Sequence, residues 1–106
     1  MGAGDQVRVA FAKGQSDLTE EARAPLKALV DSLNSDAKLR VELQAFADGT
    51  QETASQARRL SLSRALAIRS YLIEQGLLST RMDVRALGNR FEGGPPDRVD
   101  VVVSER

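Results

Sequence analysis

Cysteine, histidine and tryptophan are all absent from this chain of 106 residues. Without histidine and cysteine the chain lacks the commonest zinc ligands, the thiol nucleophile and the usual general base near neutral pH. The absence of cysteine is compatible with an oxidising or a reducing compartment, so it does not place the protein. We therefore expect no metal, no cofactor and no enzymatic activity.

Other features of the composition argue against nucleic acid and membranes as binding partners. Aromatic residues make up only 4% of the chain, which disfavours a sheet that stacks RNA bases. Lysine plus arginine equals aspartate plus glutamate at 15 each, so net charge gives no general attraction to nucleic acid or to an acidic membrane. No apolar run approaches the roughly 18 residues of a membrane span. We expect membrane attachment only through parts of a longer protein, and residues 1–5 to be an engineered start or disordered.

The periodicity of apolar residues predicts the element order β-α-β-α-β-β. Alternation predicts strands at residues 6–12, 38–47, 81–87 and 97–103. A helical period predicts helices from Thr19 to about residue 34 and from about Ala54 to Gln75, and a Gly/Pro-rich loop covers 88–96. Strand–helix–strand units favour parallel crossovers, whereas the short final loop favours an antiparallel last strand. The predicted fold class is therefore a single α/β two-layer sandwich over residues 1–106, with both helices on one face of a mixed four-stranded sheet.

The first predicted helix leaves two interpretations of Pro25. Proline either kinks the helix, or the well-formed helix begins there with Pro25 in its first turn. The buried stripe is expected to follow the i, i+3, i+4, i+7 rule, and its members are Leu26, Leu29, Val30 and Leu33.

The second predicted helix carries an arginine in the middle of its apolar stripe. Arg64 lies there, whereas Arg58, Arg59 and Arg69 fall at the edge of the stripe or outside it. Burying a lone charge costs roughly several kcal/mol of folding free energy unless the charge is paired and hydrogen-bonded. The stripe consists of Ala57, Leu60, Ser61, Arg64, Ala65, Ile68, Tyr71 and Leu72.

Two interpretations of Arg64 remain open from the residues alone. The simpler one is an internal salt bridge, or a side chain that reaches past the sheet edge to water. The other is a partly open anion site beside the loop after the second strand, which carries Asp48 and Thr50. In that case Asp48 and Arg64 offer opposite charges to a zwitterion.

Leu62, Leu66 and Ile73 lie roughly opposite the stripe on the same helix. We favour scattered surface residues, or packing against the first helix. The alternative is a dimer or partner face.

Several short motifs together resemble one known family. "LSLSRA" (60–65) and "YLIEQGL" (71–77) resemble the "LSxRRA…YLxxxGI" signature of OmpA-like peptidoglycan-binding domains. "AFADGT" (45–50) is similar to that family's "GHTDNT", "ALG" (86–88) to its "GxG"-like turn, and "DRVDVVV" (97–103) to its terminal "NRRVEIxI".

The resemblance extends over residues 7–103 and implies a site and a location. In that family the loop aspartate binds the ammonium group of a diaminopimelate residue in the peptide stem, and the helix arginine binds its carboxylate. Carried over by position, these residues are Asp48 and Arg64, with Thr50 supporting the loop and Arg98 matching the second arginine of "NRRV". The implied protein is a periplasmic module of a Gram-negative outer-membrane or envelope protein, bound to the cell wall.

The chain also departs from the family pattern. Ala45, Phe46 and Ala47 stand where the family has Gly, His and Thr. Asp97 stands where it has an arginine and is a rival partner for Arg64 or Arg98. These changes keep a second interpretation open, namely an OmpA-like scaffold that binds protein or dimerises and no longer binds peptidoglycan.

Overall fold

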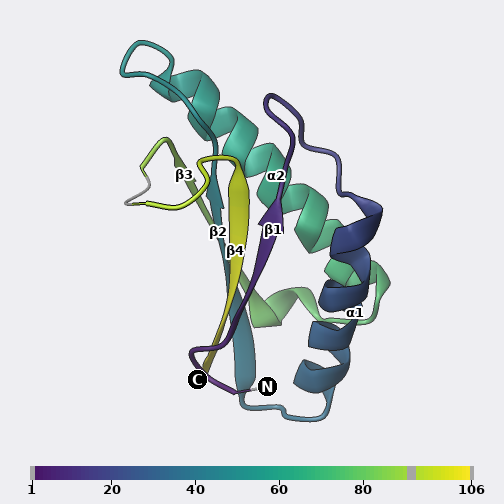
Figure 1. Cartoon of the computed structure of the whole chain (residues 1–106). Helices are drawn as coiled ribbons and strands as arrows, with labels where there is room; N and C mark the ends of the chain where they lie inside the picture. The colour runs from purple at the N-terminus through teal and green to yellow at the C-terminus, as the bar shows by residue number, and fades with distance from the viewer. Residues whose placement is uncertain (1, 91–92, 106) are drawn as a thin grey trace.

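The computed structural model describes residues 2–90 and 93–105, and it has the predicted order of elements (Figure 1). Of the predicted loop 88–96, Phe91 and Glu92 lie outside the described residues, as does Met1. The elements are β1 (Gln6–Ala10), α1 (Glu20–Asn34), β2 (Leu39–Phe46), α2 (Ala54–Glu74), a 3₁₀ turn η1 (Ser79–Arg81), β3 (Met82–Gly88) and β4 (Arg98–Glu105).

The strands form one mixed sheet in the order β1-β4-β2-β3. β2 and β3 are parallel neighbours joined through α2, as a crossover unit requires. β4 lies between β1 and β2 and runs antiparallel to both. The last element of the chain therefore occupies an inner position in the sheet, and the predicted fold class is confirmed.

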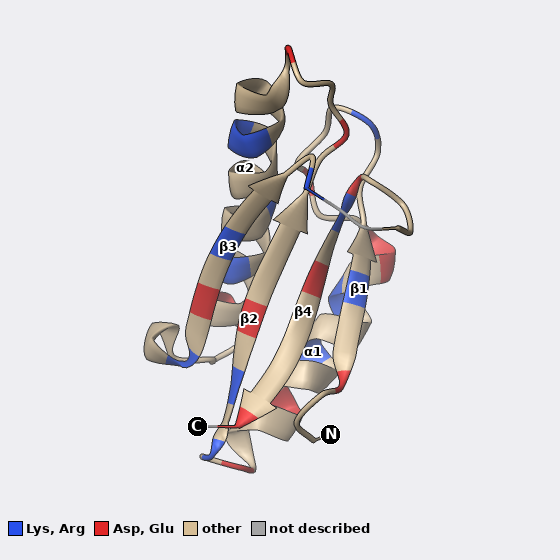
Figure 2. Ribbon diagram, turned by 90° about the vertical axis from the view of Figure 1, so that its left-hand side faces the viewer, with Lys and Arg blue, Asp and Glu red and all other residues tan. Residues whose placement is uncertain are grey.

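One face of the sheet and the two helices enclose the apolar core. Figure 2 shows the sheet in front with α1 and α2 behind it. Alternation decides which strand residues face the helices: Leu39, Val41, Leu43 and Ala45 of β2 are all at most 4% exposed, as predicted. The other main contributors to the core are Leu26, Leu29, Val30 and Leu33 of α1, Ala65, Ile68 and Leu72 of α2, and Val99, Val101 and Val103 of β4.

The opposite face of the sheet carries ion pairs in place of helices, and blue and red segments lie side by side on its strands in Figure 2. The pairs join neighbouring strands: Arg40 to Asp83 at 2.9 Å, and Arg8 to Asp100 at 2.9 Å. The hydrogen bond from Arg8 to Asp100, together with the negative charge of Asp100, raises the pKa of Arg8. This face thus carries charged side chains and no covering helix, although Asp100 on it is itself buried.

Helix α1 begins at Glu20, so the prediction that the well-formed helix might start at Pro25 is wrong. Pro25 lies inside the helix, where its missing N–H leaves one main-chain acceptor without its usual donor. Burial of the predicted stripe stabilises the helix despite this loss, since Leu26, Leu29, Val30 and Leu33 are each fully buried.

Helix α2 ends as the sequence predicts, with Gly76 just beyond it at a φ of 105°. This left-handed conformation is the one that glycine adopts readily after a helix. Leu62, Leu66 and Ile73 are 41%, 44% and 41% exposed, so a large part of each side chain is open to solvent. Among the helices of the described ranges, none has the length and apolar character needed to cross a membrane.

Candidate functional site

Three segments meet at the end of the sheet that lies away from both chain termini (Figure 1). They are the segment after β1, the loop after β2, and residue Asp97 just before β4. They meet because β1 and β2 run in the same direction and β4 runs antiparallel to both. Arg64 extends to this junction from α2, behind the sheet.

Arg64 is the largest fully buried side chain among the described residues, and its guanidinium is bound on several sides. Nε donates to the carbonyl of Gln15 at 2.7 Å, and Nη2 donates to the carbonyl of Ala12 at 3.1 Å. Nη1 donates to the carbonyl of Phe46 at 3.0 Å and to Asp97 Oδ1 at 2.9 Å. These bonds use most of the five donors of a guanidinium and join both loops and the start of β4 to α2.

Asp97 provides the negative charge that the sequence requires for Arg64. The Arg64 side chain is 0% exposed, whereas that of Asp97 is 17% exposed. The Asp97 carbonyl accepts the N–H of Phe11 at 3.0 Å, so its main chain continues the β1–β4 pairing. The ring of Phe11 also lies 5.2 Å from the guanidinium carbon of Arg64. In this conformation the internal salt bridge is the correct interpretation of Arg64, and no open contact joins it to Asp48.

The loop after β2 places Asp48 at the surface beside this salt bridge. Asp48 is exposed, and its main-chain N–H donates to Asp97 Oδ1 at 3.3 Å. Within residues 2–90 and 93–105, no hydrogen bond or ion pair involves the Asp48 carboxylate. The structure thus brings Asp48 and Arg64 to the same carboxylate oxygen of Asp97 without a direct contact between them.

Thr50 and Thr53 fasten the loop to the start of α2. The Thr50 N–H donates to Thr53 Oγ1 at 2.8 Å, and the Thr53 N–H donates to Thr50 Oγ1 at 3.3 Å. Just before Thr50 the loop passes close to the helix, since a Cβ on Gly49 would lie 2.9 Å from the Cβ of Ala57. Thr50 therefore holds the loop in place, and Gly49 is needed there for space.

Arg98 does not extend toward Asp48. It is 6% exposed, and its Nε donates to Asp100 Oδ2 at 3.1 Å. Its Nη1 donates to the carbonyls of Gly93 and Pro95, at 2.8 and 2.6 Å. The guanidinium carbon lies 4.4 Å from the ring centre of Phe46. These contacts make Arg98 a residue that shapes the segment leading into Asp97.

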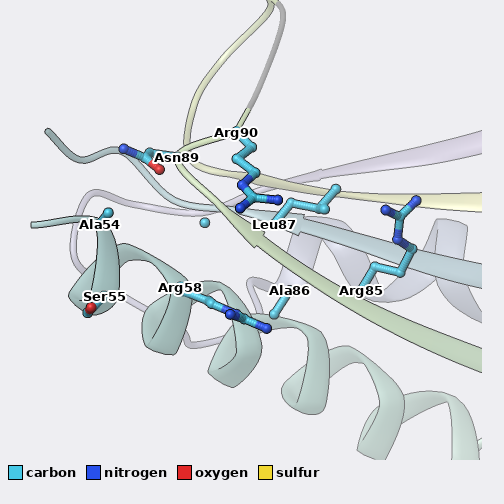
Figure 3. Close-up of a pocket in the computed structure, with 9 residues that line it drawn as sticks. Ala54, Ser55, Arg58, Arg85, Ala86, Leu87, Asn89 and Arg90 are labelled. Carbon is cyan, nitrogen blue, oxygen red and sulfur yellow. The ribbon is translucent and has the colours of Figure 1, made fainter. Parts of the chain in front are cut away.

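A pocket of about 400 Å³ opens beside the same loop, between the start of α2 and the end of β3 (Figure 3). Among the residues that the structure describes, its lining includes Arg58, Arg85 and Arg90 and no acidic residue. Figure 3 shows Arg58 on the helix side of β3 and the other two arginines on the far side of the strand. Asn89, also in the lining, donates to the carbonyl of Thr50 at 3.2 Å and so joins the pocket to the loop. The sequence placed Arg58 at the edge of the apolar stripe or outside it and did not predict this pocket.

Ser61 and Gly88 fix the end of β3 to α2, and sequence reasoning gave neither of them this role. The fully buried Ser61 hydroxyl donates to the carbonyl of Arg58 at 2.8 Å and accepts the N–H of Gly88 at 3.1 Å. Gly88 has a φ of 58°, and a Cβ there would lie 3.1 Å from the main chain of Arg58. The "ALG" motif was the available signal, because a glycine at a strand end often marks a close main-chain approach.

No group of three or more acidic, histidine or cysteine side chains suited to a metal ion occurs among the residues that the structure describes. The site therefore consists of one buried arginine, an internal carboxylate and an exposed acidic loop. Together with the two-layer sandwich, this defines a small α/β domain with a charged cluster at one end of its sheet.

The chain belongs to the OmpA family, whose model matches residues 10–95. The resemblance found in the sequence is thereby confirmed. Solved structures share the fold at low sequence identity. The peptidoglycan-associated lipoprotein of Burkholderia pseudomallei is 22% identical with a TM-score of 0.81, and the match covers 92% of this chain and 89% of that one.

Two further solved structures extend the comparison. The OmpA-like domain of FopA1 from Francisella tularensis subsp. tularensis SCHU S4 is 21% identical, with a TM-score of 0.77 over 94% of this chain and 72% of that one. The C-terminal domain of Helicobacter pylori MotB is 13% identical, with a TM-score of 0.79 over 94% and 85% of the two chains. No match was found among curated proteins.

Proposed function

We propose that this domain is a non-catalytic module that binds peptidoglycan through a diaminopimelate-containing stem peptide and holds an envelope protein to the cell wall. Asp48 takes the ammonium group of the diaminopimelate, and Arg64 takes its carboxylate. Thr50 keeps the loop in position, and Arg98 shapes the segment before β4. The corresponding location is the periplasm of a Gram-negative bacterium, in association with the outer membrane or envelope.

One observation carries the proposal. Among the described residues, the exposed Asp48 carboxylate has no partner, and it lies next to a buried guanidinium whose carboxylate partner, Asp97, is partly exposed. Charge-assisted hydrogen bonds of the kind that a zwitterion would make contribute about 1.5–3 kcal/mol each. Membership of the OmpA family and the likeness to a protein named as peptidoglycan-associated also support it.

The test is a calorimetric titration of the domain with a diaminopimelate stem peptide. We expect saturable binding that is lost or much weakened by Asp48→Asn, which removes the negative charge at an exposed position and should leave the fold intact. Asp31→Asn, an exposed aspartate on α1, is the matched control and should bind like the wild type.

A stem peptide with lysine in place of diaminopimelate lacks the side-chain carboxylate and should bind more weakly. Absence of binding at millimolar peptide, or equal binding by wild type and Asp48→Asn, would contradict the proposal.

A second function is favoured by the closed salt bridge and by three exposed apolar side chains on α2. Leu62, Leu66 and Ile73 are each more than two-fifths exposed, and Arg64 is fully enclosed. The alternative is therefore an OmpA-like scaffold that dimerises or binds protein through this face without peptidoglycan.

Leu66→Glu distinguishes the two functions. If the face is an interface, the substitution should convert a dimer to a monomer in sedimentation analysis, and the stem peptide should not bind. A wild-type domain that is monomeric at high concentration and binds the stem peptide would count against the scaffold.

A further inference from the structure

The four acceptors that the described residues place around Arg64 differ in their freedom to move. Three are main-chain carbonyls, those of Ala12, Gln15 and Phe46. The fourth is the side-chain carboxylate of Asp97. A main-chain carbonyl can leave only if the chain itself moves, whereas a side chain can change rotamer. Because Arg64 is 0% exposed, an external group can contact it only by replacing one of these acceptors.

Asp97 is the acceptor that an external group can replace. Its main chain is held by the hydrogen bond from Phe11, and Pro95 and Pro96 precede it. Its side chain is partly exposed, and within the described ranges Oδ1 accepts only the bond from Arg64 and the longer bond from the Asp48 N–H. Rotation of this one side chain would open a path from the surface to the guanidinium beside Asp48.

We infer that Asp97 is an internal occupant of a carboxylate-binding site on Arg64, so that an external carboxylate binds by displacing it. The place of Asp97 Oδ1 is suited to such a ligand because it combines a guanidinium N–H with the main-chain N–H of Asp48. Asp97 is then the residue that sets affinity at this site. The chemical class of the ligand follows from the contacts, whereas its identity as a stem peptide rests on the proposed function.

Competition between Asp97 and an external carboxylate predicts how loss of Asp97 changes the stability of the domain and its affinity for carboxylates. Binding replaces one carboxylate by another, so the wild type gains little from the Arg64 contact itself. Loss of the Asp97 charge leaves the buried guanidinium of Arg64 without a counter-charge, and an external carboxylate then supplies that counter-charge. Removing the internal carboxylate should therefore destabilise the free domain and strengthen its binding of carboxylates.

The first experiment uses acetate as the probe and thermal unfolding as the measurement. In Asp97→Ala, acetate should raise the Tm saturably and by more than chloride does at the same ionic strength. Asp83→Ala is the matched control, because Asp83 also pairs with an arginine at 2.9 Å but its side chain is 58% exposed. Acetate and chloride should act alike on this control and on the wild type. If acetate raises the Tm of Asp97→Ala no more than chloride does, the inference is overturned.

The second experiment uses Asp97→Asn, which keeps an acceptor oxygen for Arg64 and so protects the fold. A neutral hydrogen bond competes less well than a charged one, so we expect this variant to bind the stem peptide about tenfold more tightly than the wild type. Equal or weaker binding by the variant, with a wild type that binds, would also overturn the inference. If neither protein binds the peptide while acetate still stabilises Asp97→Ala, the inference is supported and the proposed function fails.

Discussion

A single arginine lies at the centre of the site, because Arg64 is the largest fully buried side chain among the described residues and donates four hydrogen bonds to them. Its carbonyl and carboxylate partners belong to three segments that are far apart in sequence. Buried polar networks of this kind strengthen a fold when every member is satisfied, and weaken it when one is removed. The sequence indicated that Arg64 needs a negative partner, and Asp97 was one of the residues that it offered.

Arg64→Ala is expected to destabilise the domain severely. It removes a counter-charge from Asp97 and donors from the three carbonyls, and breaking a buried pair costs about 3–5 kcal/mol. A domain of this size has only about 5–15 kcal/mol of stability, so urea unfolding should show a large shift in midpoint. Arg59→Ala, an exposed arginine on the same helix, is the control and should change stability by less than about 0.5 kcal/mol. Similar losses in the two variants would show that the Arg64 network contributes little.

At the scale of elements, the periodic patterns were enough to predict both helices and all four strands. Their apolar residues repeat at intervals that only one backbone geometry can bury, as the stripe of α1 and the alternation of β2 show. The start of α1 was left open because proline is tolerated near a helix start and only tertiary packing decides whether the helix extends before it. The pocket by Arg58 was missed because it depends on how far β3 reaches along α2, which periodicity does not specify.

The junction of β3 with α2 gives a prediction at this scale. Gly88→Ala is expected to destabilise the domain by more than Gly14→Ala. Both glycines have positive φ, 58° and 74°, so both alanines carry the conformational cost of about 1–2 kcal/mol. Only at Gly88 does the added Cβ also meet the main chain of Arg58, at 3.1 Å, whereas nothing lies within 4 Å at Gly14. Urea unfolding of the two variants measures the difference, and equal losses would mean that the close approach has no energetic consequence.

At the scale of the whole molecule, the sheet depends on its final strand. β4 pairs with both β1 and β2 and contributes Val99, Val101 and Val103 to the core. The crossover pattern of the sequence predicted a mixed sheet, but it did not specify that β4 lies between β1 and β2. Strand order is set by long-range pairing, such as that of Arg8 with Asp100, 92 residues apart.

Truncation of the chain after Asp97 should abolish cooperative folding, although it removes only the segment from Arg98 onward. Without β4, the strand β1 has no neighbour in the sheet and β2 keeps only β3. Far-UV circular dichroism and urea titration would report the loss, and deletion of residues 2–3 serves as a control that keeps every strand. A truncated chain that still unfolds cooperatively would contradict the inner role of β4.

The inner place of β4 also has a consequence for the order of events on the ribosome. Synthesis delivers α2, and with it the Arg64 guanidinium, well before the residues that neutralise this charge. Until Asp97 and β4 emerge, closing the core over Arg64 would bury a cation without its carboxylate partner, which is energetically costly. We therefore expect the core to close stably only after Asp97 has been made.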